Sequence, residues 1–263
     1  MTDGKQIRHS VPPHQSAPQT ASPQGEAKRI INFITDLLYP RHCPYCDDIL
    51  PPGGELIHTK CLKKLKLQTP PYCMKCGTKI VNGEGKLCAG CKTRRHGFER
   101  GRSLYEYSSA ANSIYRFKYA NRQEYAKAYA EQINDYLGEF LRKINADAIV
   151  PIPLHPRKEN KRGYNQARLL TREISRLSGI PEIKNLLIRK RYTAPMKLLS
   201  FDERQKNLKN AFIVRKNSVK LKRIILVDDI YTTGATMDEA ARALHEAGIP
   251  EVYFVALAGG ASL

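Results

Sequence analysis

Residues 224–236 carry more chemistry than any other window of this sequence. Four apolar residues, 224–227, form a continuous run that predicts a parallel strand buried on both faces. Two carboxylates, Asp228 and Asp229, follow where this strand is expected to end, and small hydroxyl residues around Gly234 come next. A strand, an acidic pair and a hydroxyl loop in this order favour a site for a phosphorylated sugar.

Each part of the window matches a part of such a ligand. Backbone N–H groups of a loop that opens a helix bind anions, and glycine lets the backbone approach closely. The predicted phosphate loop comprises Thr232, Thr233, Gly234, Ala235 and Thr236. Asp228 and Asp229 can accept hydrogen bonds from ribose hydroxyls or hold Mg²⁺, which prefers oxygen ligands. An acid pair in an ordinary turn is the alternative, and the ordered set of features argues against it.

A helix is expected to follow the loop, because apolar residues recur at helical spacing up to Ala247. Thr236 and Glu239 have the spacing of a capping box at its start. Gly248 followed by Pro250 predicts its end. In open α/β sheets, ligand sites lie beyond the carboxyl ends of the strands, which is where this loop would lie.

The seven cysteines and one histidine recur in four pairs with a constant period of about 15 residues. The pairs are Cys43/Cys46, His58/Cys61, Cys73/Cys76 and Cys88/Cys91. Each pair presents two donors from one tight turn, and two pairs complete a tetrahedral Zn²⁺ shell. The spacing therefore predicts two structural zinc ions, one Cys₃His and one Cys₄, with no open catalytic position.

The pairing of these four turns has two solutions. Sequential pairing makes two zinc ribbons, and interleaved pairing makes a cross-brace. We favour ribbons, because each then closes with a short hairpin. A set of disulfides is the alternative to metal, and both His58 and an expected cytosolic compartment argue against it.

Charge and length restrict the partners. The chain has 263 residues and carries 44 Lys and Arg against 25 Asp and Glu, a formal net charge of +19. This excess favours polyanions such as nucleic acid, phosphorylated ligands or an anionic membrane surface. The sequence has no apolar stretch long enough to span a bilayer, and its start does not resemble a secretory signal, so we expect a cytoplasmic protein.

Composition divides the chain into three parts. Residues 1–28 are rich in Pro, Ser, Gln and Ala and predict a disordered tail. Residues 30–38 predict a short amphipathic helix that packs against the next module, with a membrane-surface role as the alternative. The predicted zinc domain spans 29–100, and an α/β domain spans 101–263.

The α/β domain begins where the cysteines end. The sequence predicts strands at 102–107, 147–152, 186–190 and 211–214, and helices at 109–118, at 124–143 and from about Asn165. The long basic segment 191–210 is interpreted as a flap. The loop after strand 147–152 contains Arg157 and Lys158 and is a second candidate anion site, with a solvated charged loop as the alternative.

Aromatic residues lie among cations in the first part of this domain. They are Tyr105, Tyr107, Tyr115, Phe117, Tyr119, Tyr125 and Tyr129. Aromatic residues interleaved with positive charge are typical of surfaces that bind single-stranded nucleic acid. The alternative is that these side chains belong to a core.

Several separated stretches resemble the ComF family of competence-associated proteins, from about residue 30 to the C-terminus. They are the four metal-binding pairs, 117–119, 150–157, 162–166, Arg204 with Asn207, 211–212 and the 224–236 window. Residues 224–236 look like the phosphoribosyl-pyrophosphate (PRPP) signature of type I phosphoribosyltransferases. The resemblance implies the fold of those enzymes, a mainly parallel sheet flanked by helices, with a small zinc-ribbon domain before it.

The resemblance also implies residue roles. Asp228 and Asp229 would bind the ribose hydroxyls, and the loop 232–236 would bind the 5′-phosphate of PRPP held with Mg²⁺. Arg157 and Lys158 would lie at the pyrophosphate, and 191–210 would be a mobile flap. Two departures from the family pattern are His58, where relatives often carry Cys, and Met196, where Gln is expected.

Two functions follow from this resemblance. The first is a PRPP-binding protein of natural competence that handles incoming single-stranded DNA in the cytoplasm, with a competence helicase or other DNA-processing proteins as partners. The alternative is an active phosphoribosyltransferase of nucleotide salvage or biosynthesis with no DNA role. The sequence indicates no general base, acceptor pocket or oligomeric state.

Overall fold

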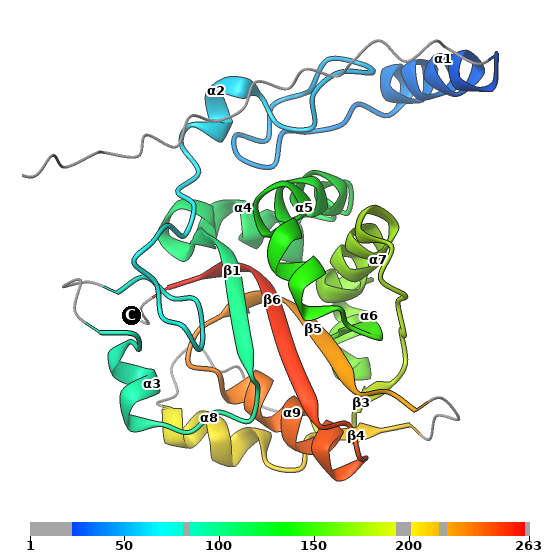
Figure 1. The fold of residues 1–263 in the computed structure, drawn as a ribbon. Coiled ribbons are helices and arrows are strands. Elements are labelled where there is room, and N and C mark those ends of the chain that lie inside the picture. Colours follow the sequence, from blue (N-terminus) through cyan, green and yellow to red (C-terminus); the bar gives the residue numbers. More distant parts are fainter. Residues whose placement is uncertain (1–22, 81–84, 193–200, 216–219, 261–263) are drawn as a thin grey trace, which may run out of the picture.

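The core of the molecule is a parallel sheet with helices on both faces (Figure 1). A computed structural model describes residues 23–80, 85–192, 201–215 and 220–260. The sheet has the strand order β1-β6-β5-β2. Its strands are β1 (Arg100–Glu106), β2 (Ala148–Pro151), β5 (Arg223–Tyr231) and β6 (Glu251–Gly259). All three neighbouring pairs are parallel, which confirms the predicted α/β class.

The apolar runs of the sequence become the central strands. Ile224, Ile225, Leu226 and Val227 of β5 are all fully buried. A strand with helices on both faces has no solvated side, so its apolar residues are continuous instead of alternating. The strand predicted at 147–152 and the one at 102–107 correspond to β2 and β1.

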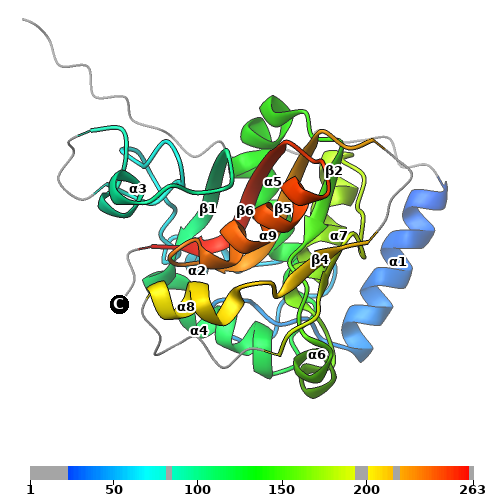
Figure 2. The same cartoon turned by 90° about the horizontal axis from the view of Figure 1, so that it is seen from below.

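Helices cover the two faces of the sheet as separate groups (Figures 1 and 2). One face carries α4 (Tyr107–Tyr119), α5 (Tyr125–Ile144) and α7 (Gln166–Ser178). The other face carries α9 (Ala235–Glu246), which packs on β6 and against α8 (Phe201–Leu208). The predicted helices 109–118 and 124–143 and the helix from about Asn165 are therefore confirmed.

Two segments predicted as loops contain helices. The loop after β2 forms α6 (Pro156–Arg162), which ends at Gly163 with a φ of 83°. The expected flap lies between the antiparallel strands β3 (Leu187–Arg189) and β4 (Phe212–Val214) and contains α8. Strong charge hid the periodicity of both helices. Residues 193–200, including Met196, lie outside the described residues.

The N-terminal part begins with α1 (Pro23–Leu38), followed by α2 (Thr59–Leu62) and α3 (Ala89–Thr93). The helix expected at 30–38 is present and starts earlier, so it includes the end of the stretch predicted as a disordered tail. Residues 1–22 lie outside the described residues. Asp36 joins α1 to the next module by accepting a hydrogen bond from the Gly53 amide at 2.8 Å. The apolar side chains of α1 are nevertheless exposed, so the expected apolar packing is not formed.

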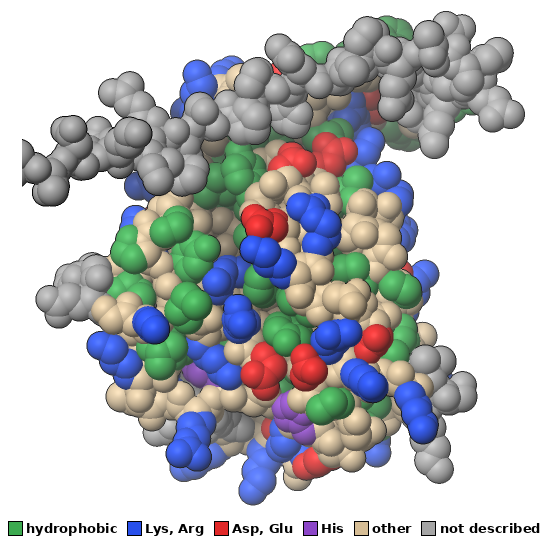
Figure 3. Space-filling model, viewed as in Figure 1, with side chains coloured by type: hydrophobic (Ala, Val, Ile, Leu, Met, Phe, Trp, Pro, Cys, Tyr) green, Lys and Arg blue, Asp and Glu red, His purple; other side chains and the backbone are tan. Residues whose placement is uncertain are grey.

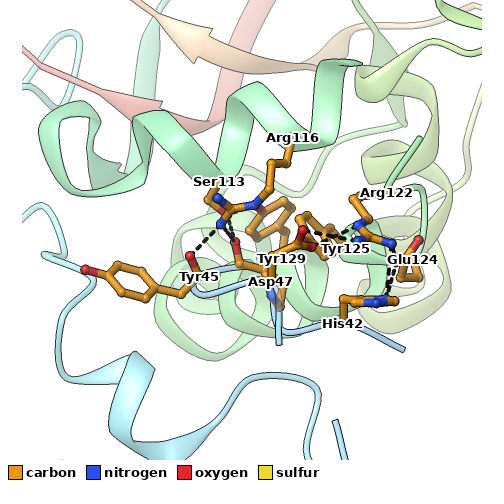
Figure 4. A network of polar contacts seen from close by, with 10 residues as sticks. His42, Tyr45, Asp47, Ser113, Arg116, Arg122, Glu124, Tyr125 and Tyr129 are labelled. Atoms are coloured by element: carbon orange, nitrogen blue, oxygen red, sulfur yellow. Dashed lines mark hydrogen bonds and ion pairs between the residues drawn. The ribbon is translucent and has the colours of Figure 1, made fainter. Parts of the chain in front are cut away.

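The first metal-binding module, residues 41–65, attaches to α4 and α5 through a polar network (Figure 4). The Asp47 carboxylate accepts hydrogen bonds from Arg122 at 2.8 and 3.1 Å and from the Tyr125 hydroxyl. Ser113 and Arg116 of α4 donate to the Pro44 carbonyl. We call this module the first ribbon.

The second module, residues 71–92, attaches to the sheet itself. The Gly101 amide of β1 donates to the Lys75 carbonyl at 2.8 Å. The connecting segment 66–68 bonds to the free edge of β1, with Glu106 N to Lys66 O at 2.7 Å and Gln68 N to Leu104 O at 2.8 Å. We call this module the second ribbon.

On one face of the molecule, positive charge is spread rather than gathered at one point. On the face seen in Figure 3, Lys and Arg side chains lie across the globular part with hydrophobic side chains between them. This distribution is consistent with the net charge of +19. Among the helices of the described residues, none is both long enough and apolar enough to cross a membrane.

Candidate functional site

The acid pair lies within β5 and not beyond its end. β5 continues to Tyr231, where it pairs with Gly259 of β6, so the prediction that the strand ends before Asp228 is wrong. β2 pairs with β5 only as far as Val227. The edge of β5 next to both acids is therefore left open by β2.

The two carboxylates face opposite sides of the sheet, because side chains alternate along a strand. Asp229 is buried and pairs with Lys118 of α4, with Nζ 2.8 Å from Oδ1. Asp228 lines a pocket formed with the loop that follows. Its Oδ1 accepts a hydrogen bond from the Asp229 amide at 2.8 Å. Asp228 thus lies at the pocket, whereas Asp229 forms an ion pair with Lys118.

The environment of Asp228 favours its neutral form. Burial, and secondarily the charge of Asp229, raises the pKa of Asp228 to about 7. Lys118 and Arg189 act in the opposite direction. A hydroxyl-rich or cationic ligand would restore the solvation that this carboxyl lacks.

The loop 232–236, which we call the phosphate loop, completes the pocket. Thr232, Thr233, Gly234, Ala235 and Thr236 all line it together with Asp228. α9 begins at Ala235, so the amides of the loop coincide with the first turn of the helix, where the helix dipole attracts anions.

The start of α9 differs from the expected capping box. Gly234 is the N-cap, with a φ of 88°, and no side chain caps the helix. Glu239 bonds Arg242 at 2.7 Å instead of reaching back to the helix start. Without a side-chain cap, the first amides of α9 keep their hydrogen-bonding capacity for a ligand.

Three further cations come from α6 and β3, and one of them, Arg189, interacts with Asp228. Arg157 and Lys158 of α6 lie over the ring of Tyr192, at 5.9 and 5.5 Å from its centre. Burial, followed by the charges of Arg189 and Arg162, lowers the pKa of Lys158. Arg189 of β3 is buried and interacts electrostatically with Asp228. Arg189 therefore supplies positive charge to Asp228, and Lys158 lies within electrostatic range of Arg189.

Sequence reasoning assigned no role to Lys118 or Arg189. Lys118 lies in the stretch 117–119 that contributed to the family resemblance, which was the available signal. Arg189 ends a three-residue strand and looked like one cation among many in a basic segment. Only the fold brings it to Asp228.

The eight predicted metal donors form two clusters. The first comprises Cys43, Cys46, His58 and Cys61, and the second comprises Cys73, Cys76, Cys88 and Cys91. Within each cluster, all donor atoms lie within 4.8 Å of one another. The pairing is sequential, as expected for ribbons and not for a cross-brace.

Donor spacing in both clusters fits a tetrahedral ion. Cys76 Sγ and Cys88 Sγ are 3.7 Å apart, and Cys46 Sγ is 3.4 Å from His58 Nδ1. Zn–S bonds of about 2.3 Å give a tetrahedron with edges of about 3.8 Å. No cysteine of the chain is in a disulfide, and thiolate and imidazole donors suit zinc.

The thiols of the second cluster compete for negative charge. A hydrogen bond with Cys91 lowers the pKa of Cys76 to about 4, and the same hydrogen bond raises the pKa of Cys91. Burial raises the pKa of Cys88. A divalent cation at the centre would stabilise all four as thiolates.

The aromatic residues divide into core and surface. Tyr105, Phe117, Tyr125 and Tyr129 are buried, so the core alternative holds for these four. Tyr115 and Tyr119 of α4 are 64% and 59% exposed, and their rings are 5.0 Å apart. Arg162 lies 5.0 Å from the centre of the Tyr119 ring. An exposed aromatic pair with a cation therefore remains next to Lys118.

Two family models match the chain. A double zinc ribbon domain matches residues 34–92, and a phosphoribosyl transferase domain matches residues 159–262. The fold and the donor clusters agree with both. The molecule is thus of the class that joins a double zinc ribbon to a phosphoribosyltransferase domain.

Comparison with individual proteins gives the family. The chain is 31% identical over 223 residues to Competence protein F of Haemophilus influenzae, covering 82% of this chain and 96% of that protein. It is 32% identical over 233 residues to Competence protein ComFC of Bacillus subtilis, covering 85% and 92%. DNA utilization protein YhgH of Escherichia coli is 30% identical over 187 residues, covering 68% and 80%. The chain belongs to the ComF family.

Proposed function

We propose that this chain binds PRPP with Mg²⁺ in the pocket between Asp228 and the phosphate loop, and that it acts on single-stranded DNA in the cytoplasm during natural transformation. The observation that carries the first part is the pocket itself. A carboxyl and five loop residues at the start of α9 line one cavity at the carboxyl end of a parallel strand. The names of the relatives, which are competence and DNA utilization proteins, support the second part.

The residues around the pocket match the parts of PRPP. The phosphate loop would bind the 5′-phosphate through its amides and Thr hydroxyls. Asp228 would accept hydrogen bonds from the ribose hydroxyls, and Asp229 would hold Lys118 in place beside them. Lys158, with Arg157 and Arg189, would face the pyrophosphate. Mg²⁺, held through Asp228 and the phosphates, would neutralise part of the ligand's charge.

Turnover would follow if an acceptor reaches the sugar. The acceptor would form a bond to C1 of the ribose while the bond from C1 to the pyrophosphate oxygen breaks, and the pyrophosphate would leave with the electron pair. Arg157 and Lys158 would stabilise that leaving group. Because no general base is assigned, we propose binding of PRPP as the primary property and a salvage or biosynthetic transferase as the alternative.

The exposed tyrosines support contact with single strands. Tyr115 and Tyr119 offer two ring faces for stacking, and Arg162 and the spread of surface cations offer charge for the backbone. We propose that a strand lies along this side of α4. We further propose that each cluster holds one structural Zn²⁺ and that the domains divide into 29–100 and 101–263.

Calorimetry with PRPP and Mg²⁺ tests the first part, using the wild type and the Asp228→Asn/Asp229→Asn double variant. We expect binding by the wild type and a loss of at least tenfold in the variant. Absence of binding by the wild type would overturn the assignment. Release of pyrophosphate with a nucleobase, together with indifference to DNA, would establish the alternative.

Fluorescence anisotropy with a single-stranded oligonucleotide tests the second part. Binding should weaken steeply with salt, because each neutralised phosphate releases counterions. Salt-independent binding, or none, would remove the DNA role and leave the PRPP site standing. The two parts of the proposal can therefore fail separately.

A further inference from the structure

Two buried side chains lie between the second cysteine cluster and the phosphate loop. They are Tyr231, the last residue of β5, and His96, which follows the second ribbon by four residues. Tyr231 also lines the pocket with Asp228 and the phosphate loop, whereas His96 does not and was not singled out by the sequence. Both contact Gly234, at the centre of the phosphate loop.

Tyr231 connects the cluster to the loop directly. Its ring stacks on Phe254 of β6, with centres 4.6 Å apart and planes at 12°. Its hydroxyl lies beside the Cys76 thiol, within the second cluster. A Cβ on Gly234 would lie 3.0 Å from the same hydroxyl. One rigid ring thus touches a metal donor and the loop.

His96 makes the second connection. Its side chain is only 2% exposed, and its Nδ1 lies 2.9 Å from Oδ2 of Asp238 in the first turn of α9. The next amide, Gly97 N, donates to Oδ1 of the same carboxylate at 3.0 Å. The His96 ring also stacks on Phe98 at 4.8 Å. The segment that leaves the second ribbon is therefore tied to the start of α9.

These contacts explain why residue 234 is glycine. Its φ of 88° is left-handed, and a Cβ there would lie 2.9 Å from Cε1 of His96. The Gly234 carbonyl accepts a hydrogen bond from the Asp238 amide at 2.8 Å. The turn of the phosphate loop at Gly234 is therefore packed against His96 and Tyr231 and hydrogen-bonded to Asp238.

A cavity in the same region is lined by both the second cysteine cluster and the phosphate loop. It is lined by Cys76, Cys88 and Cys91 of the second cluster and also by Thr232 and Thr233. The first cluster is placed differently, because Cys43 and Cys61 pack in the core on the α4 and α5 side of the sheet. The second cluster and the phosphate loop therefore form parts of one cavity wall.

We infer that His96 and Tyr231 are positioning residues that make the second cysteine cluster a structural part of the phosphate site. The inference rests on the proposed PRPP site for its functional meaning, and on the contacts above for its geometry. A loop already held in its bound shape loses less freedom when a phosphate binds. Loss of either connection should therefore weaken ligand binding, although His96 lies outside the pocket lining and Tyr231→Phe keeps the backbone and ring of its residue.

Hydrogen exchange measured by mass spectrometry on the full chain tests the geometry, with no ligand present. We expect His96→Ala, Tyr231→Phe and Cys88→Ser to speed exchange of the amides 234–238. His96→Asn, which keeps a donor for Asp238, should restore part of the protection. Asp47→Asn, at the attachment of the first ribbon, is the matched control and should leave these amides unchanged.

Calorimetry with PRPP and Mg²⁺ on the same variants tests the consequence. We expect His96→Ala and Tyr231→Phe to weaken binding on the order of tenfold, since small misplacements of binding groups have effects of this size or larger. Unchanged exchange at 234–238 in both variants would overturn the inference. If His96→Ala does not fold, Tyr231→Phe decides, because it removes one hydroxyl and keeps the ring.

The two readouts separate this inference from the proposed function. If the wild type does not bind PRPP, the proposed function fails, and the exchange data still decide whether the second cluster supports the loop. If the wild type binds and the variants bind equally well with unchanged exchange, the inference fails and the proposed function stands.

Discussion

The two ribbons repeat one local design but attach to the rest of the molecule in different ways. Asp47 and Gly77 occupy the same place in the repeat, directly after the second cysteine of a Cys-x₂-Cys turn. Both have left-handed backbones, with φ of 67° and 75°. The Asp47 side chain bonds Arg122 and Tyr125 on the helical scaffold. At Gly77, a Cβ would lie 2.7 Å from the Gly101 carbonyl oxygen of β1.

The same turn therefore has a different role in each ribbon, because its contacts with the rest of the molecule differ. The first ribbon is held by side chains, in a polar network whose residues do not line the pocket. The second ribbon is held by close backbone approach to the sheet, and its exit segment reaches α9. The first is therefore expected to contribute mainly to stability, and the second to contribute to the ligand site as well.

Replacement of Gly77 should give the largest effect. Gly77→Ala places a methyl group against backbone atoms of β1 and strains a left-handed residue, so we expect a loss of about 2–4 kcal/mol in the free energy of unfolding. PRPP affinity should fall with it. Chemical denaturation and calorimetry measure the two quantities, and a change in stability with no change in affinity would weaken the contrast between the ribbons.

Replacement of Asp47 should give a smaller loss of stability and no loss of PRPP affinity. Asp47→Asn keeps a residue that tolerates a positive φ but removes the charge bonded to Arg122 and Tyr125. We expect a loss of about 1.5–3 kcal/mol in stability, since hydrogen bonds to charged groups contribute about this much. PRPP affinity should stay within twofold of the wild type. A large loss of affinity would show that the first ribbon also supports the pocket.

The exposed tyrosines of α4 allow single-stranded DNA binding to be tested separately from PRPP binding. Tyr115→Ala removes one exposed ring of the aromatic pair, and we expect single-stranded DNA to bind about tenfold more weakly, since stacking contributes about 1–3 kcal/mol per base. PRPP binding should not change. Anisotropy with a phenylalanine variant as the control checks whether the ring, and not the hydroxyl, is responsible.

Chemical denaturation at a series of pH values tests the effect of the Asp228 charge on stability, independently of the second ribbon. The pKa of Asp228 is about 7 in the folded chain against an ordinary value of 3.8, so the folded state binds the proton more tightly than the unfolded state. The contribution of Asp228 to stability is therefore lost as the pH rises through 7. Asp228→Asn should be more stable than the wild type at pH 8 by on the order of 1 kcal/mol, and the difference should vanish near pH 4.

Much of the fold could be predicted from the sequence because its signals are local. Apolar runs identified β2 and β5, helical spacing identified α4, α5 and α9, and the period of the donors identified both clusters. Charge concealed α6 and α8, whose residues give little hydrophobic periodicity. β6 was not predicted, although it is the strand that pairs with β5 on the side away from β2.

The sequence predicted only those residues of the candidate site that are consecutive in the chain. The acid pair and the phosphate loop are consecutive, so their spacing carries the signal. Lys118 and Arg189 come from α4 and β3 and reach the acids only through folding. His96 gave no signal at all, because its partners Asp238 and Gly234 lie about 140 residues away in the sequence.

The end of β5 was misplaced for a related reason. Acidic residues are unfavourable in strands, so Asp228 and Asp229 looked like the start of a loop. The hydrogen bonds of β6 continue past them to Tyr231 and override that preference. The outcome is an alternation in which Asp228 faces the pocket and Asp229 faces Lys118.

A crystal structure of the full chain soaked with PRPP and Mg²⁺ tests the central claim most directly. The account predicts the 5′-phosphate against the amides of 232–236 and the ribose hydroxyls within hydrogen-bonding distance of Asp228. A pocket that stays empty at saturating ligand, or a sugar bound away from both Asp228 and the phosphate loop, would contradict it.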